Sequence, residues 1–163
     1  MVISQTIPTT PGITTALPKV DFSDCFATTN KLDNLETIAH LIFNNPPAWV
    51  KVLFAIRNSL AGLAGLKHRM PADYHIRYEA GGYIGFFKIF QIGEHELVMG
   101  LNDKHLNFRV SIFNSVQETL NIKVTTLVEY NNSMGKLYMS IIRPFHVMVV
   151  KSMVKKACKV IKD

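Results

Sequence analysis

The stretch LNFRVSIFNSVQETLNIKVTTLVEY, residues 106–130, decides the fold class of this chain. Apolar residues occupy every second position of LNFRVSI (106–112), and the alternation returns in LNIKVTTLVEY (120–130). Successive side chains of a β-strand point to opposite faces of the sheet. Each part is therefore predicted to be a strand with one buried and one solvated face.

Two further strands are predicted before this stretch. YIGFFKIFQI (83–92) is apolar on both faces, and ELVMGL (96–101) follows a turn at Gly93 and Glu94. Strands that follow one another at short intervals with tight turns are typical of an antiparallel meander.

The turn in front of Leu106 places Asp103, Lys104 and His105 side by side. Asn and Asp favour turns because their short side chains bond their own backbone and tolerate left-handed geometry. A turn thus explains Asp103 without any chemistry. The alternative is that Asp103 and His105 lie at the mouth of a site, where a histidine titrates near neutral pH.

The N-terminal third is predicted to contain a strand and two short helices. KVDFSDCFATT (19–29) is the strand, and Asp33 with Glu36 has capping-box spacing in front of an amphipathic helix. NNPP ends that helix and begins another, with apolar residues at helical spacing over 49–63. Residues 1–18, rich in Thr and Pro, are predicted to be a flexible leader that resists any regular ladder or helix.

A long C-terminal helix is predicted over 136–162, after an Asn or Ser cap in NNSMG. Pro144 disfavours helix at Arg143, so we expect a kink or a break there, with a second helix starting at the proline. The expected fold class is α+β: an antiparallel sheet, a long C-terminal helix, and two short helices after the first strand.

The composition bounds the class of protein. A chain of 163 residues is the size of one domain, here 19–163, and 48% hydrophobic residues are too many for a disordered chain. Its apolar runs are broken at Arg143 and Pro144 short of the ~18 residues of a membrane span. The N-terminus does not resemble a signal peptide, and Cys25 and Cys158 are too few for a disulfide framework. A soluble, cytoplasmic protein is expected.

The net charge of +6 is concentrated at the C-terminus. From Arg143 onward there are six basic residues and one acid, which leaves 12 basic and 11 acidic residues before it. This distribution argues against a groove that tracks phosphates, so no nucleic-acid partner is expected. Four lysines recur every three or four residues, and cations near the C-terminus of a helix are stabilised by the helix dipole without any partner. The alternative interpretation is that these lysines dock on an anionic membrane or an acidic protein. The lysines are Lys151, Lys155, Lys159 and Lys162.

The order of the predicted elements resembles the helix-grip fold of the polyketide cyclase, START and birch-pollen-allergen-like (SRPBCC-like) superfamily. GLNDKHLNFRVSI (100–112), TTLVEYNNSMGKLYM (125–139) and RPFHVMVVKSM (143–153) resemble blocks of a bacterial domain-of-unknown-function family related to it. The most specific run consists of Gly135, Tyr138, Pro144, Phe145 and His146. The resemblance covers about Lys19 to Lys162. It implies a curved sheet that grips the last helix, with an apolar cavity between them, and it supplies no established catalytic residues.

Such a cavity suits a small hydrophobic ligand held by one or two hydrogen bonds. The same residues could instead fill a packed core, and the sequence leaves both readings open. The expected lining residues are Phe86, Phe90, Phe108, Val110, Ile112, Val124, Thr126, Tyr138 and Met148.

His146 is the best single candidate for a general acid or base, assisted by Tyr138 in a cyclase-like or hydrolase-like enzyme. The alternative is structural, because an imidazole can bond the backbone that Pro144 frees. GEHE (93–96) has metal-ligand side chains, but neighbours on a strand point to opposite faces, so it is interpreted as a solvated hairpin. No phosphate-binding or nucleotide-binding glycine motif is present, and no metal or cofactor is expected.

Overall fold

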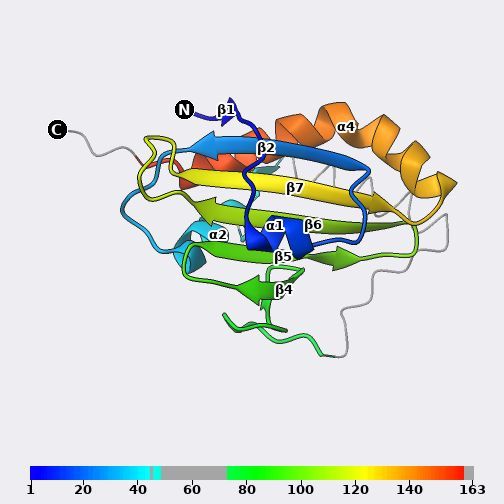
Figure 1. Ribbon diagram of the computed structural model, residues 1–163, viewed down its shortest axis with the longest axis horizontal. Coiled ribbons are helices and arrows are strands. Elements are labelled where there is room, and N and C mark those ends of the chain that lie inside the picture. The colour runs from blue at the N-terminus through cyan, green and yellow to red at the C-terminus, as the bar shows by residue number, and fades with distance from the viewer. Residues whose placement is uncertain (45, 49–72, 160–163) are drawn as a thin grey trace.

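One antiparallel sheet organises the part of the chain that the structure describes, in the strand order β1-β2-β7-β6-β5-β4-β3. This computed structural model describes residues 1–44, 46–48 and 73–159. The strands are β1 (Ile3–Ser4), β2 (Phe22–Thr28), β3 (Tyr83–Ile84), β4 (Phe87–Ile92), β5 (Glu96–Asn102), β6 (Leu106–Asn114) and β7 (Ile122–Tyr130). The helices are α1 (Pro11–Thr15), α2 (Leu35–Phe43) and α4 (Ser133–Val154), followed by the 3-10 turn η1 (Lys155–Ala157). The predicted α+β class, with an antiparallel sheet and a C-terminal helix, is confirmed (Figure 1).

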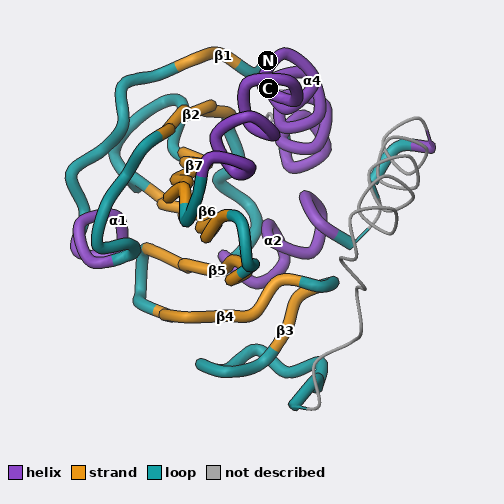
Figure 2. The backbone as a smooth tube through the Cα atoms, turned by 90° about the vertical axis from the view of Figure 1, so that its right-hand side faces the viewer, coloured by secondary structure: helices purple, strands orange, loops and turns teal. Residues whose placement is uncertain are grey.

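The helices lie on both sides of the sheet. Figure 2 shows α1 on one side and both α2 and α4 on the other. We call the side under α2 and α4 the inner face. β2 pairs with β7, so the first long strand lies beside the last one, from Phe22 opposite Val128 to Thr28 opposite Ile122.

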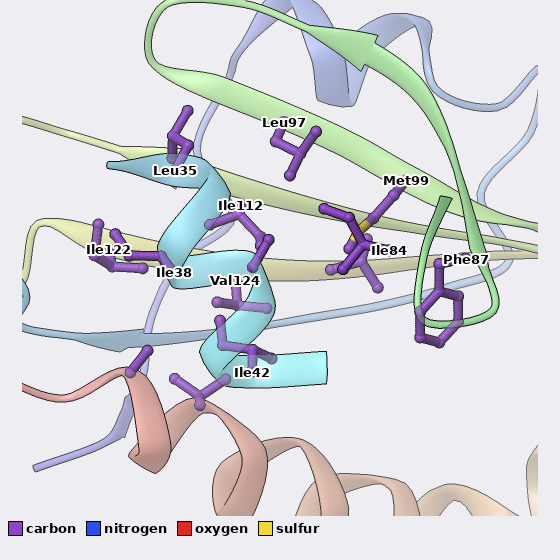
Figure 3. Packing of buried hydrophobic residues seen from close by; sticks show 14 of the residues in the cluster. Leu35, Ile38, Ile42, Ile84, Phe87, Leu97, Met99, Ile112, Ile122 and Val124 are labelled. Carbon is purple, nitrogen blue, oxygen red and sulfur yellow. The ribbon is translucent and has the colours of Figure 1, made fainter. Parts of the chain in front are cut away.

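The core lies between α2 and the inner face (Figure 3). Ile38 and Ile42 of α2 are fully buried, as are Leu97 and Ile112 from the facing strands. Burying a side chain of this size stabilises a fold by about 1.5–3 kcal/mol. The apolar spacing of α2 and the alternation of the strands therefore act on the same core.

The meander forms as predicted except at its first strand. The stretch 83–92 is two strands, because Ile84 pairs with Phe87 across a turn of Gly85 and Phe86. Gly85 has φ +60, a conformation that suits glycine at the first central position of a tight hairpin turn.

The predicted start of the first helix is wrong by one residue. Asn34 caps α2, since its side chain accepts a hydrogen bond from the Thr37 amide at 2.8 Å. Asp33 instead accepts bonds from Asn30 and Lys159. The second expected helix, over 49–63, lies outside the described residues.

The N-terminal residues contain regular structure, so the expectation that 1–18 would resist it is wrong. β1 pairs with β2, and α1 begins with Pro11 directly after its cap, Thr10. Proline is well tolerated at the first helical position, where its missing N–H would have had no partner. The Thr10 hydroxyl accepts from the Ile13 amide at 3.3 Å.

α4 is one continuous helix from Ser133 to Val154. Of the two alternatives expected at Pro144, a kink or a break, the break with a second helix starting at the proline is therefore wrong. The proline removes the hydrogen bond to the Ser140 carbonyl. Ser140 is exposed, so water can satisfy that carbonyl. Met139 and Met153, on either side of the proline, are buried on the same helix and hold both halves to the fold.

By length and composition, Ser133–Ala157 could also cross a membrane. The expectation that no segment is long and apolar enough to span a membrane is therefore wrong as far as length and composition are concerned. In the fold, α4 contacts α2, β2 and β7.

Candidate functional site

A cavity of about 350 Å³ lies between the inner face, α2 and α4. This volume is within the range of about 300–1,000 Å³ of small-molecule sites. Its walls are mostly aliphatic and aromatic. The lining residues are Ile42, Phe43, Phe86, Phe87, Leu101, Leu106, Phe108, Val110, Val124, Thr126, Val128, Tyr138, Met139, Ile142, His146, Val149, Val150, Met153 and Val154.

Strand register explains why the floor of the cavity is apolar. Val110 pairs with Thr126, and Phe108 pairs with Val128. Residues directly opposite each other in an antiparallel pair share a face. The alternation of LNFRVSI and IKVTTLV therefore projects one row of apolar residues into the cavity, with Thr126 as the polar member.

Six of the nine predicted lining residues lie on the cavity wall: Phe86, Phe108, Val110, Val124, Thr126 and Tyr138. Ile112 is buried in the adjacent core and does not line the cavity. Phe90 and Met148 are exposed and are not part of the cavity wall, so their predicted inward position is wrong. The register shifts between Ile89 and Gln91, and Phe90 lies beneath the Arg109 guanidinium, whose Cζ is 3.6 Å from the ring centroid.

His146 reaches from α4 toward Asp24 on β2. Its Nε2 is 3.2 Å from Asp24 Oδ2 and 3.4 Å from Oδ1. Both side chains are largely buried, with exposed fractions of 13% and 15%. A carboxylate that holds one imidazole nitrogen orients the ring, so Asp24 positions the His146 side chain that lines the cavity.

Two cationic side chains of α4, Arg143 and Lys151, lie over aromatic rings of β2 beside this pair. The Arg143 guanidinium lies over the Phe22 ring at 5.3 Å, and the Lys151 ammonium over the Phe26 ring at 5.4 Å. Phe22, Asp24 and Phe26 alternate along β2 and share the inner face, because they oppose residues of the inner row of β7. Arg143 and Lys151 therefore lie on either side of Asp24 along α4. Among the described residues, only His146 forms an ion pair with the Asp24 carboxylate.

Comparison with known proteins gives one match. The model of the family "Protein of unknown function (DUF2867)" matches residues 16–153. The chain belongs to the DUF2867 family. No curated protein and no solved structure matches it.

The DUF2867 match includes Asp24, which is not among the site residues predicted from the sequence. The available signal was an acidic residue between Phe22 and Phe26 at alternate positions of a strand. An acid at an inward position of an otherwise apolar row is rarely tolerated unless it is paired.

Tyr138 and His146 lie on the same side of α4 and both line the cavity. They are eight residues apart, which separates their backbones by about 12 Å along the helix. The structure therefore places both in one cavity without bringing them together as neighbours.

Asp103 and His105 lie in the β5–β6 turn and do not line the cavity. The Asp103 carbonyl accepts a bond from the Asn131 side chain at 2.7 Å, and the His105 carbonyl accepts from the Asn131 amide at 3.0 Å. The His105 ring lies 3.1 Å from the Asn132 side chain. This geometry supports the interpretation of NDKH (102–105) as a turn. The turn is hydrogen-bonded to Asn131, which lies just before α4, and its His105 ring contacts Asn132, the cap of α4.

GEHE (93–96) is solvated only in part, which corrects the sequence interpretation. Glu94 and His95 are exposed, whereas Glu96 is buried on the face opposite α4. Its carboxylate accepts bonds from the Thr10 hydroxyl at 2.6 Å, the Gly12 amide at 2.9 Å and the Ser111 hydroxyl at 2.6 Å. Glu96 thus anchors the N-terminal segment to the sheet. Within the described ranges, no cluster of three or more His, Cys, Asp or Glu residues could hold a metal.

The predicted lysine stripe does not continue along one helix. Lys151 is on α4, Lys155 is in η1, and Lys159 lies beyond both, 2.8 Å from Asp33 Oδ2. Lys162 lies outside the described residues. Binding to an anionic membrane through these lysines stays a prediction.

Proposed function

We propose that this protein binds a small, mostly apolar molecule in the cavity between the sheet and α4. The observation that carries the proposal is the composition of the wall, whose described residues are apolar apart from Thr126, Tyr138 and His146. A hydrophobic pocket with a few convergent polar groups is the usual form of a ligand site.

We also propose that the DUF2867 family is related to the helix-grip superfamily. The arrangement that supports this is an antiparallel sheet, a long C-terminal helix packed on it, and an apolar cavity between the two.

Native mass spectrometry of the freshly purified protein, followed by organic extraction, is the first test of binding. A titration with 1-decanol, followed by NMR, completes it. Amide signals of Val124 and Thr126 are expected to shift, and those of Val98, on the other face, are expected to stay in place.

Val110→Phe is the matched variant, because it places a ring inside the cavity. It is expected to abolish the shifts while retaining the far-UV circular dichroism of the fold. Val116→Phe, at an exposed position, is the control and should bind as the wild type does. Unchanged binding by Val110→Phe, or no binding by the wild type, contradicts the proposal.

A second candidate is an enzyme in which His146 transfers a proton. The Asp24–His146 pair favours it, since a carboxylate that orients an imidazole is the usual support of a general base. Turnover of the extracted molecule by the wild type, lost in His146→Ala, would support this candidate.

A further inference from the structure

We infer that the ligand of this cavity is an uncharged hydrophobe with a single hydroxyl or carbonyl group, and not a carboxylic acid or an amine. This inference rests on the proposed function and specifies the chemistry of its ligand.

Two of the three polar side chains that the described residues give the wall, Thr126 and His146, lie in one region, and Tyr138 lies about 12 Å further along α4. Thr126 lies opposite Asp24 in the β2–β7 pairing, and His146 contacts Asp24 from above. The opposite part of the wall, made by Phe43, Phe86 and Phe87, is aromatic. A ligand with one polar end and one apolar body matches this division, with its polar end toward β7 and α4.

In the part of the chain that the structure describes, the wall has no Lys or Arg side chain to neutralise a ligand carboxylate. Among the described residues that line the cavity there is no Lys, Arg, Asp or Glu. Arg143 and Lys151 lie over the rings of Phe22 and Phe26 and are not part of the lining. Burying a charge without a partner is far more costly than burying a hydroxyl, so a carboxylate is disfavoured.

Asp24 adds to this exclusion. The carboxylate lies 3.2 Å from His146 Nε2, so a ligand carboxylate bound at the other ring nitrogen would lie close to a second negative charge. Two neighbouring like charges disfavour each other's charged form, so Asp24 makes this region unfavourable for an acid. An amine is disfavoured for a different reason: the described residues that line the cavity include no Asp or Glu, and Asp24, which does not line it, is already in contact with His146.

A hydroxyl meets no such obstacle. It donates one hydrogen bond and accepts others, so it can pair with the Thr126 hydroxyl or the His146 ring in either protonation state. A carbonyl can accept from the Thr126 hydroxyl. Neither requires the Asp24–His146 pair to open.

The volume limits the size of the ligand. A cavity of about 350 Å³ holds about a dozen non-hydrogen atoms, if each occupies roughly the 30 Å³ of a water molecule in the liquid. A ten-carbon chain with a single polar end is of this size.

The test compares three ten-carbon probes that differ only in the head group: 1-decanol, decanoate and decylammonium. Each is titrated by isothermal calorimetry at pH 7.5 into the full chain, below its critical micelle concentration. We expect 1-decanol to bind at least tenfold more tightly than either charged probe.

Asp24→Asn supplies the second measurement, since it removes the charge that excludes the acid. It is expected to raise the affinity for decanoate relative to 1-decanol at least threefold. Glu94→Gln removes the same charge at an exposed position and should leave the ratio unchanged.

The outcomes separate the inference from the proposed function. If decanoate or decylammonium binds as tightly as 1-decanol, the inference is wrong and the cavity is still a binding site. If the affinity for decanoate relative to 1-decanol is the same in Asp24→Asn as in Glu94→Gln, the charge of Asp24 does not exclude acids, and the inference is overturned. If none of the probes binds, both the inference and the proposed function fail.

Discussion

Cys25 and Cys158 lie in opposite electrostatic environments. Burial raises the pKa of the Cys25 thiol. A hydrogen bond with Thr28 is the largest cause that lowers the pKa of Cys158, and the N-terminal ammonium, 3.2 Å from its Sγ, acts in the same direction. The thiolate is the reactive form, so the two thiols should differ in rate.

We predict that iodoacetamide alkylates Cys158 before Cys25 at pH 7.5. Peptide mass spectrometry over a time course measures both rates in one sample. Cys158→Ser is the control and should leave only slow labelling. Equal rates at the two cysteines, or faster labelling of Cys25, would show that this assignment of environments is wrong.

At the residue scale, the sequence predicted the residues whose position follows from strand alternation. It missed the residues whose role depends on a contact with a residue far away in the sequence. Phe108, Val110 and Val124 line the cavity because alternation alone places them on one face. Asp24 was missed because its role requires His146, 122 positions away. Phe90 was misplaced because a register shift in the strand is invisible to a simple alternation.

At the scale of elements, the first turn of α4 docks closely on the β5–β6 turn. A Cβ on Gly135 would lie 2.0 Å from the His105 carbonyl oxygen. That oxygen is backbone and cannot move aside as a flexible side chain would. The close contact also explains why this turn is rich in polar residues that resemble a functional site. Its polar groups bond the residues that begin α4.

We predict that Gly135→Ala destabilises the protein by about 1–3 kcal/mol, the usual cost of overpacking. Alanine is favoured over glycine in a helix by about 1 kcal/mol, so propensity alone predicts the opposite sign. Urea unfolding decides between the two effects. Ser140→Ala, at an exposed position of the same helix, is the control and should change stability little. A Gly135→Ala protein as stable as the wild type would mean that the turn yields at low cost.

Apolar spacing predicted that α2 and α4 are helices, but it predicted the residues at which they begin and end less accurately. The break expected at Pro144 did not occur, because buried residues on both sides of the proline hold α4 in one piece. α1 was missed because five residues carry too little periodicity, and its position depends on Glu96 in a distant strand.

At the scale of the whole molecule, the end of β2, the start of α2 and the C-terminal segment are joined at Asn30. Its side chain donates to the Ala157 carbonyl at 2.8 Å and to Asp33 at 2.8 Å. The Lys159 amide donates to the Thr29 carbonyl at 2.8 Å. Such contacts between distant segments cannot be predicted from local pattern.

This junction should make stability depend on pH in the acid range. The Lys159 ammonium, followed by the Asn30 amide, lowers the pKa of Asp33 below its ordinary value of 3.8. A lowered pKa in the folded state means that the carboxylate stabilises the fold fully above the unfolded value. That contribution is lost as the pH falls from about 5, through 3.8, to below the folded pKa.

We predict that Asp33→Asn flattens the decline of the unfolding free energy between pH 5 and pH 3, because the variant no longer has this proton to bind. Urea unfolding at half-unit pH intervals gives both profiles. Glu94→Gln removes one exposed carboxylate with no buried contact, and its profile should follow that of the wild type. If Asp33→Asn also runs parallel to the wild type, the Asp33–Lys159 pair adds no net stability. The junction would then be held by the Asn30 hydrogen bonds alone.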